Sequence, residues 1–105
     1  MKIDNIYEQL KATNLCQSGY DFSVNYLGKT KSYYSVLKAR QQTPSLEALV
    51  NLDYVLRQQI EWLDEGYDER MQATVMTLAT LQLKVSEQID EQCSTNVYGA
   101  TPERL

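Results

Sequence analysis

Basic side chains gather in one short stretch of this 105-residue chain. The segment from Gly28 to Pro44 contains four basic residues and no acidic residue. These basic residues are Lys29, Lys31, Lys38 and Arg40. Ammonium and guanidinium groups bind phosphate oxygens strongly, and serine, threonine and tyrosine hydroxyls lie among them. The segment is therefore the part of the chain best suited to contact an anionic partner.

The chain contains few residues that are suited to catalysis or to metal binding. The chain has no histidine, which excludes His-dependent catalysis and histidine metal sites. Cys16 and Cys93 are far apart and match no metal-binding or redox motif, so we interpret them as reduced thiols of a cytosolic protein. The acidic cluster at residues 64–69 lacks the spacing of a calcium loop. We predict a non-enzymatic protein with no cofactor and no metal.

The charge is distributed unevenly along the chain. Residues 1–60 carry seven basic and five acidic side chains, whereas residues 61–105 carry three basic and nine acidic ones. Such a division of charge is typical of a chain with one half that binds a partner and another half that serves solubility or assembly. The net charge of −4 argues against unspecific coating of nucleic acid. Residues 1–15 do not resemble a secretory signal, and the apolar stretch Met71–Leu83 is too short to span a membrane. We therefore expect a cytoplasmic protein without a membrane segment.

The elements that position the basic segment are expected to be helices. Glycine and proline are scarce, which disfavours a turn-rich β-fold. Apolar residues three and four positions apart predict five helices, at residues 3–15, 18–28, 31–40, 45–63 and 67–93. We expect one all-α domain in which residues 1–66 form a helix-turn-helix region, residues 67–93 form a long C-terminal helix for packing or dimerisation, and residues 94–105 form a flexible tail.

Capping residues support these boundaries. Ser18 and Asp21 have the spacing of a capping box, which predicts a helix start at this point. Gly28 is the residue type that ends a helix in the left-handed conformation. Thr30 is suited to cap the third helix, and Thr43 followed by Pro44 is suited to open the fourth.

The third helix presents an outer face of small side chains between cations. At 100° per residue, Tyr34 and Leu37 point inward, and the opposite strip consists of Ser32, Ser35, Val36 and Ala39. Lys31 and Lys38 border this strip on one side, and Tyr33 and Arg40 border it on the other. Small side chains allow close approach to another surface, and cations on both flanks match the two phosphate walls of a DNA major groove about 12 Å wide.

The same residues resemble the helix-turn-helix domain of the phage repressor/Cro type. In that family a glycine ends the first motif helix, as Gly28 does here, and a Ser or Thr two positions later caps the recognition helix, as Thr30 does. Tyr34 and Leu37 match the family's core positions, and Pro44-Ser45 with Leu49 and Leu52 matches its next helix. The family's Leu-Ala pair in the first motif helix aligns with Phe22-Ser23 only if one extra residue is allowed.

The resemblance implies a DNA-binding transcriptional regulator that acts by occupying an operator in double-stranded DNA. It implies contacts from Lys31, Ser32, Tyr33 and Val36 to base edges or a thymine methyl group in the major groove. Thr30, Lys38 and Arg40 are implied as contacts to phosphate.

The fifth helix is apolar on more than one face, and repressor-type domains commonly bind DNA as two-fold pairs. We therefore expect a homodimer whose interface consists of Met71, Val75, Leu78, Val85 and Ile89. An alternative function stays open at this stage. The domain would then be a non-enzymatic protein-interaction module without DNA binding, whose Ser32, Ser35 and Ala39 strip docks a protein partner.

Overall fold

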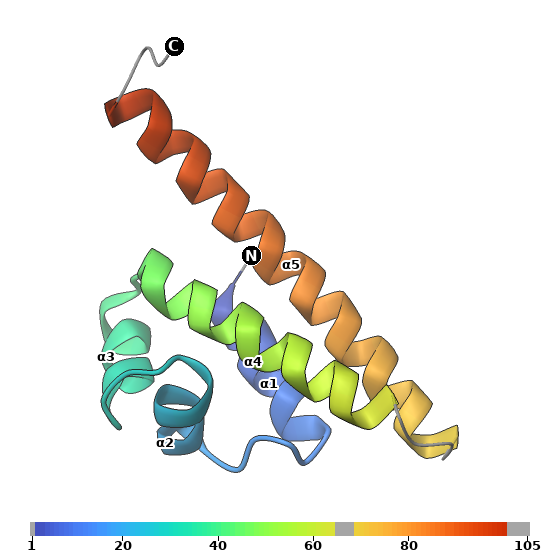
Figure 1. The fold of residues 1–105 in the computed structure, drawn as a ribbon. Coiled ribbons are helices and arrows are strands. Elements are labelled where there is room, and N and C mark those ends of the chain that lie inside the picture. The colour runs from blue at the N-terminus through green and yellow to red at the C-terminus, as the bar shows by residue number, and fades with distance from the viewer. Residues whose placement is uncertain (1, 65–68, 101–105) are drawn as a thin grey trace.

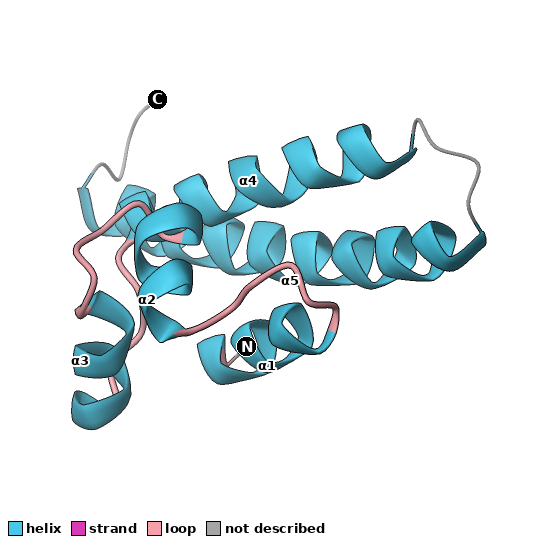
Figure 2. Ribbon diagram, turned by 90° about the horizontal axis from the view of Figure 1, so that it is seen from below, coloured by secondary structure: helices cyan, strands magenta, loops and turns pink. Residues whose placement is uncertain are grey.

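Two long antiparallel helices form one layer of the molecule. In the computed structural model, which describes residues 2–64 and 69–100, these are α4 (Leu46–Asp64) and α5 (Glu69–Ala100), packed along each other (Figure 1). The remaining helices are α1 (Ile3–Ala12), α2 (Gly19–Asp21) with its continuation η1 (Phe22–Tyr26), and α3 (Tyr33–Arg40). Figure 2 shows no strand in the drawn ribbon of the described residues. The prediction of an all-α, five-helix domain with a long C-terminal helix is confirmed.

The core joins the leucines of the long helices to an aromatic cluster. Leu49, Leu52 and Leu56 on α4 are fully buried, as their spacing predicts. They pack in the same core as the rings of Tyr7, Phe22, Tyr26 and Tyr34. Neighbouring ring centroids in this cluster lie 4.8 to 5.9 Å apart, within the range in which aromatic pairs attract.

Several predicted boundaries are displaced in the structure. The first helix ends at Ala12 instead of Leu15, because the chain turns at Asn14, which has a left-handed φ of 66°. The fifth helix passes the predicted end at Cys93 and continues to Ala100. The predicted break at Asp64-Glu65-Gly66 and the last five residues of the predicted tail fall largely outside the described residues. No helix of the described ranges is both long and apolar enough to cross a membrane.

The helix before the turn contains a π-helical segment. The backbone N–H of Leu27 donates to the carbonyl of Phe22, five residues earlier, at 2.9 Å. A π-turn holds one residue more than an α-turn. This extra residue lets Phe22 and Ser23 both point into the core, where both are fully buried. It also corresponds to the one-residue offset by which Phe22-Ser23 departs from the Leu-Ala pair of the repressor/Cro pattern.

Candidate nucleic-acid interface

The outer face of α3 is open to solvent. Ser35, Val36 and Ala39 are exposed, while Tyr34 and Leu37 are buried as predicted. Lys31 and Ser32 are also exposed and lie in the turn that leads into the helix. The residues that were predicted to form the ridge and its cationic borders therefore come together on one surface, with Tyr33 as the exception described below.

The start of α3 differs from the prediction. The helix begins at Tyr33 instead of Lys31, and neither Thr30 nor Ser32 provides a side-chain cap. The missing cap is supplied from another helix, because the Ser23 hydroxyl accepts a hydrogen bond from the Tyr34 backbone N–H at 2.9 Å. Ser23 also donates to the Gly19 carbonyl at 2.8 Å. The predicted capping role of Thr30 is therefore wrong. Its exposed position is compatible with the predicted phosphate contact.

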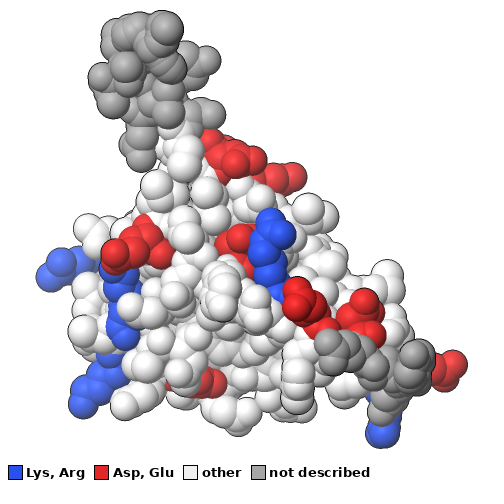
Figure 3. Space-filling model, viewed as in Figure 1, with Lys and Arg blue, Asp and Glu red and all other residues white. Residues whose placement is uncertain are grey.

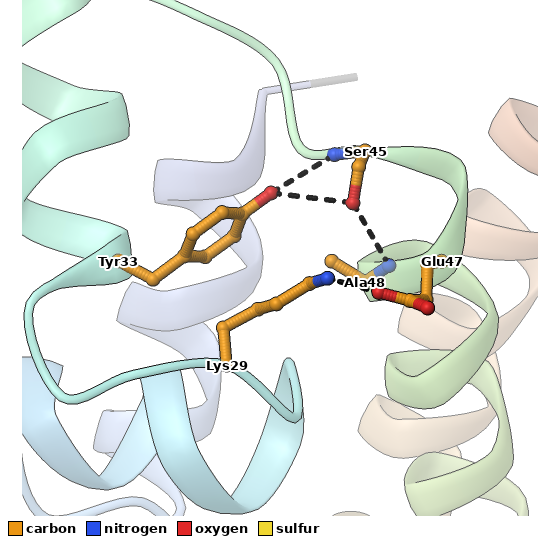
Figure 4. Close-up of polar contacts among 5 residues, drawn as sticks. All are labelled: Lys29, Tyr33, Ser45, Glu47 and Ala48. Atoms are coloured by element: carbon orange, nitrogen blue, oxygen red, sulfur yellow. Dashed lines mark hydrogen bonds and ion pairs between the residues drawn. The ribbon is translucent and has the colours of Figure 1, made fainter.

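The Tyr33 side chain packs toward α4 and away from the exposed ridge. Its hydroxyl accepts a hydrogen bond from the Ser45 backbone N–H at 3.0 Å and lies 3.4 Å from the Ser45 hydroxyl, to which it donates (Figure 4). Ser45 in turn caps α4, since its Oγ accepts from the Ala48 N–H at 3.2 Å. The predicted cap at Thr43 is therefore wrong, and the Tyr33 hydroxyl acts as a strut between α3 and α4.

An ion pair lies next to this strut. The Lys29 ammonium pairs with the Glu47 carboxylate, and its nitrogen is 5.9 Å from the centre of the Tyr33 ring (Figure 4). The hydrogen bond between the two groups lowers the pKa of Glu47 and raises the pKa of Lys29. Lys29 thus differs from the other cations of this segment, because its charge is paired with Glu47 within the fold.

Three other cations keep their charge available to solvent. Lys31, Lys38 and Arg40 are exposed and form no salt bridge within residues 2–64 and 69–100. The fold adds a fourth, since Lys2 from the start of α1 and Lys38 line the same shallow cleft beside the end of α3. Figure 3 shows Lys and Arg side chains at the edge of the molecule where α3 lies in Figure 1, and acidic side chains along α5.

Sequence reasoning missed Ser23, Ser45 and Lys2. The offset of Phe22-Ser23 was a signal that a small side chain belongs at position 23, but the hydroxyl's bond to Tyr34 depends on how two helices dock. Ser45 follows the Thr-Pro pair and is itself a favoured capping residue type. Lys2 had no sequence signal, because only the fold brings the N-terminus beside α3.

The predicted dimer interface on α5 (Met71, Val75, Leu78, Val85 and Ile89), called the seam below, is largely buried within the chain. Leu78 and Val85 are fully buried in the core, and Met71, Val75 and Ile89 pack against that core as partly buried residues. Helix α4, and to a smaller extent α1, packs against α5 within the same chain. Leu78 and Val85 therefore cannot form the predicted interface, because the seam serves the packing of α5 within its own chain.

The fold and its exposed surface define the structural class of this protein. It is an all-α domain in which a short exposed helix, bordered by cations, follows a glycine turn and is braced by α4. The chain belongs to a family of unknown function, DUF6626, whose model matches residues 3–98. Comparison with curated proteins and with solved structures found no match. Within the described residues, no group of acidic and cysteine side chains is arranged to hold a metal ion.

Proposed function

We propose that this protein is a sequence-specific, non-enzymatic DNA-binding regulator of the repressor/Cro type, which acts in the cytoplasm by occupying an operator. The observation that carries the proposal is the exposed face of α3, on which short side chains lie between cations that form no salt bridge with any described residue. A protruding helix of this form fits the major groove, and its flanking cations reach the phosphates on both sides.

The roles of individual residues follow from their positions. Lys31, Ser32 and Val36 face the floor of the groove, and Lys38 and Arg40 contact phosphates at its borders. Thr30 lies exposed at the approach to α3, where its hydroxyl is available to a phosphate oxygen. Lys2 extends the phosphate-contacting edge beside Lys38. Tyr33 holds α3 against α4 and does not contact the bases.

The π-turn is a second observation in favour of this proposal. It supplies the extra residue that aligns Phe22-Ser23 with the repressor/Cro pattern, and both side chains are buried. Gly28 adopts the expected left-handed conformation, with φ of 66°. Both features support a helix-turn-helix in which α2 with η1 precedes the recognition helix α3.

The test is fluorescence anisotropy with labelled random-sequence duplex DNA at low salt. Since unspecific binding is mostly electrostatic, the affinity should decrease linearly on a logarithmic plot against salt concentration. Binding at micromolar protein with such a slope supports the proposal. Absence of binding at micromolar protein and low salt contradicts it.

The alternative function, a protein-interaction module, has its own supporting observation. Large apolar side chains are exposed on the long helices, namely Val50, Tyr54 and Trp62 on α4 and Met76 and Leu83 on α5. The net charge of −4 also favours a protein partner over DNA. Retention on heparin at a pH above the sequence pI of about 4.7 favours DNA, and passage through the column favours the alternative.

A homodimer remains part of the proposal, because two-fold pairing matches palindromic operators. The pairing must use surfaces other than the buried seam of α5. Sedimentation equilibrium of the full chain at micromolar concentration tests it, and a single species of monomer mass at these concentrations contradicts it.

A further inference from the structure

We infer that the proposed DNA site reads thymine methyl groups through Val36, and hence prefers A·T-rich duplex DNA. This inference rests on the proposed function and names the kind of sequence that the site selects. It follows from which side chains remain free on α3 once the contacts within the fold are counted.

The outward strip of α3 includes no residue that reads a base by paired hydrogen bonds, because the exposed lysine of this helix, Lys38, lies on the border of the strip. Such readers are arginine or lysine for guanine and asparagine or glutamine for adenine. The outward positions of α3 hold Ser35, Val36 and Ala39 instead. Tyr33 is engaged with Ser45, and Arg40 occupies the last position of the helix on the flank. Hydrogen-bond readout is thus left to the turn residues Lys31 and Ser32.

Val36 is the apolar group best placed on this face. Its side chain is 40% exposed near the middle of the helix. Its neighbours on this face, Ser35 and Ala39, have shorter side chains, so the methyl groups of Val36 are the apolar groups that project farthest from the helix. A β-branched side chain holds essentially one rotamer in a helix, so little conformational freedom is lost on contact.

Only one base presents a matching group in the major groove. Thymine carries a methyl group at C5, and an apolar side chain is the usual partner for it. Contact removes the methyl groups of both partners from water, which is favourable. Guanine and cytosine edges are polar, and burying them against Val36 without a hydrogen bond is unfavourable.

The experiment compares two duplexes that differ only in this methyl group. An A·T-rich 30-base-pair duplex and its counterpart with every thymine replaced by uracil are titrated with the full chain in fluorescence anisotropy. The uracil duplex should bind about three- to tenfold more weakly, the size expected for one or two lost apolar contacts. With Val36→Ala the two duplexes should differ by less than about twofold.

Val24 provides a matched control, because it is 38% exposed but lies on η1 and not on the outer face of α3. Val24→Ala should keep the full preference for thymine. Equal binding of the two duplexes by the unmodified chain, or a preference that survives Val36→Ala, would overturn the inference while the proposed function stands. Failure to bind either duplex would overturn the proposed function and the inference with it.

A second measurement avoids any substitution in the protein. In a G·C-rich duplex, replacing cytosine by 5-methylcytosine places a methyl group at the same point of the groove. The unmodified chain should bind the methylated duplex about three- to tenfold more tightly. Unchanged or weaker binding would count against methyl recognition.

Discussion

The hydroxyl of Ser23 accepts a hydrogen bond from the backbone N–H of Tyr34 across 2.9 Å. Ser23 belongs to η1 and Tyr34 to the first turn of α3, so this bond joins the two helices of the proposed motif. Ser23 is fully buried, and its own proton goes to the Gly19 carbonyl. One side chain therefore satisfies an N–H of α3 that no residue of its own turn caps.

Replacement of this hydroxyl should be costly. In Ser23→Ala the Tyr34 N–H is left buried without an acceptor, and we expect the free energy of unfolding to decrease by about 1–3 kcal/mol. Urea denaturation, monitored by circular dichroism, measures this change in the free energy of unfolding. Ser35→Ala, an exposed serine on α3, is the control and should stay within about 0.5 kcal/mol of the unmodified chain. Equal stability of the two variants would show that the bond is not needed.

Gly28 should not tolerate a side chain. Its φ is +66°, and an added Cβ would lie 2.9 Å from Cγ of Asn51, whose amide donates to the Tyr26 carbonyl. We expect Gly28→Ala to lower the free energy of unfolding by about 1–3 kcal/mol, from backbone strain and displacement of Asn51. Gly19→Ala is the matched control, since its Cβ would meet Tyr34 at an ordinary 3.4 Å. Thermal denaturation compares the two, and a smaller loss for Gly28→Ala than for Gly19→Ala contradicts the structure.

Tyr33→Phe separates a bracing role from base contact. The variant loses the hydroxyl bonded to Ser45, and because that site is exposed we expect a modest loss of about 0.5–1 kcal/mol in unfolding free energy. The affinity for duplex DNA should change by less than about twofold, since the hydroxyl points toward α4. Tyr20→Phe, at a tyrosine that is 60% exposed, serves as control. A large loss of DNA affinity without a loss of stability would restore Tyr33 as a base contact.

The two cysteines should differ in reactivity and in their effect on pH-dependent stability. Burial, with a smaller contribution from the charge of Asp21, raises the pKa of the Cys16 thiol to about 11, whereas Cys93 is exposed. A thiol reagent at pH 8 should label Cys93 at once and Cys16 only as the chain unfolds, because the thiolate is the reactive form.

The sign of the pH effect follows from the raised pKa of Cys16. The folded state favours the protonated thiol, so its contribution to stability is complete below the ordinary thiol pKa and is lost as the pH rises toward 11. Urea denaturation between about pH 8 and 11 should show a smaller decrease in stability for Cys16→Ala than for Cys93→Ala. Rapid labelling of both thiols in the native protein would contradict the buried position of Cys16.

Local signals in the sequence predicted much of the architecture. The Ser18 cap was correct, because its side chain accepts from the Asp21 N–H three residues away. The left-handed Gly28 and the buried face of α4 were also correct, since turn chemistry and helical periodicity depend on neighbouring residues. Helical periodicity also predicted which face of α3 is exposed. Because Tyr34 and Leu37 are buried, the opposite face of the helix is open to solvent.

Features that depend on docking between helices were not predictable in the same way. Helical spacing identified Leu78 and Val85 as a packing face, but spacing cannot distinguish a partner in the same chain from one in another chain. The neighbour turned out to be α4. Likewise, Tyr33 lies on the predicted border of α3, but only the path of the loop after α3 brings Ser45 within reach of its hydroxyl.

The most direct test of the central claim is the salt dependence of DNA binding in two charge variants. Lys31→Ala/Arg40→Ala removes two cations from the proposed interface, and Lys11→Ala/Lys84→Ala removes the same charge from exposed positions on α1 and α5. For the interface variant, the slope of log affinity against log salt should become shallower by about 1–2, as expected for lost phosphate contacts. The control variant should keep the slope of the unmodified chain. Identical slopes for the two variants would contradict DNA binding through α3.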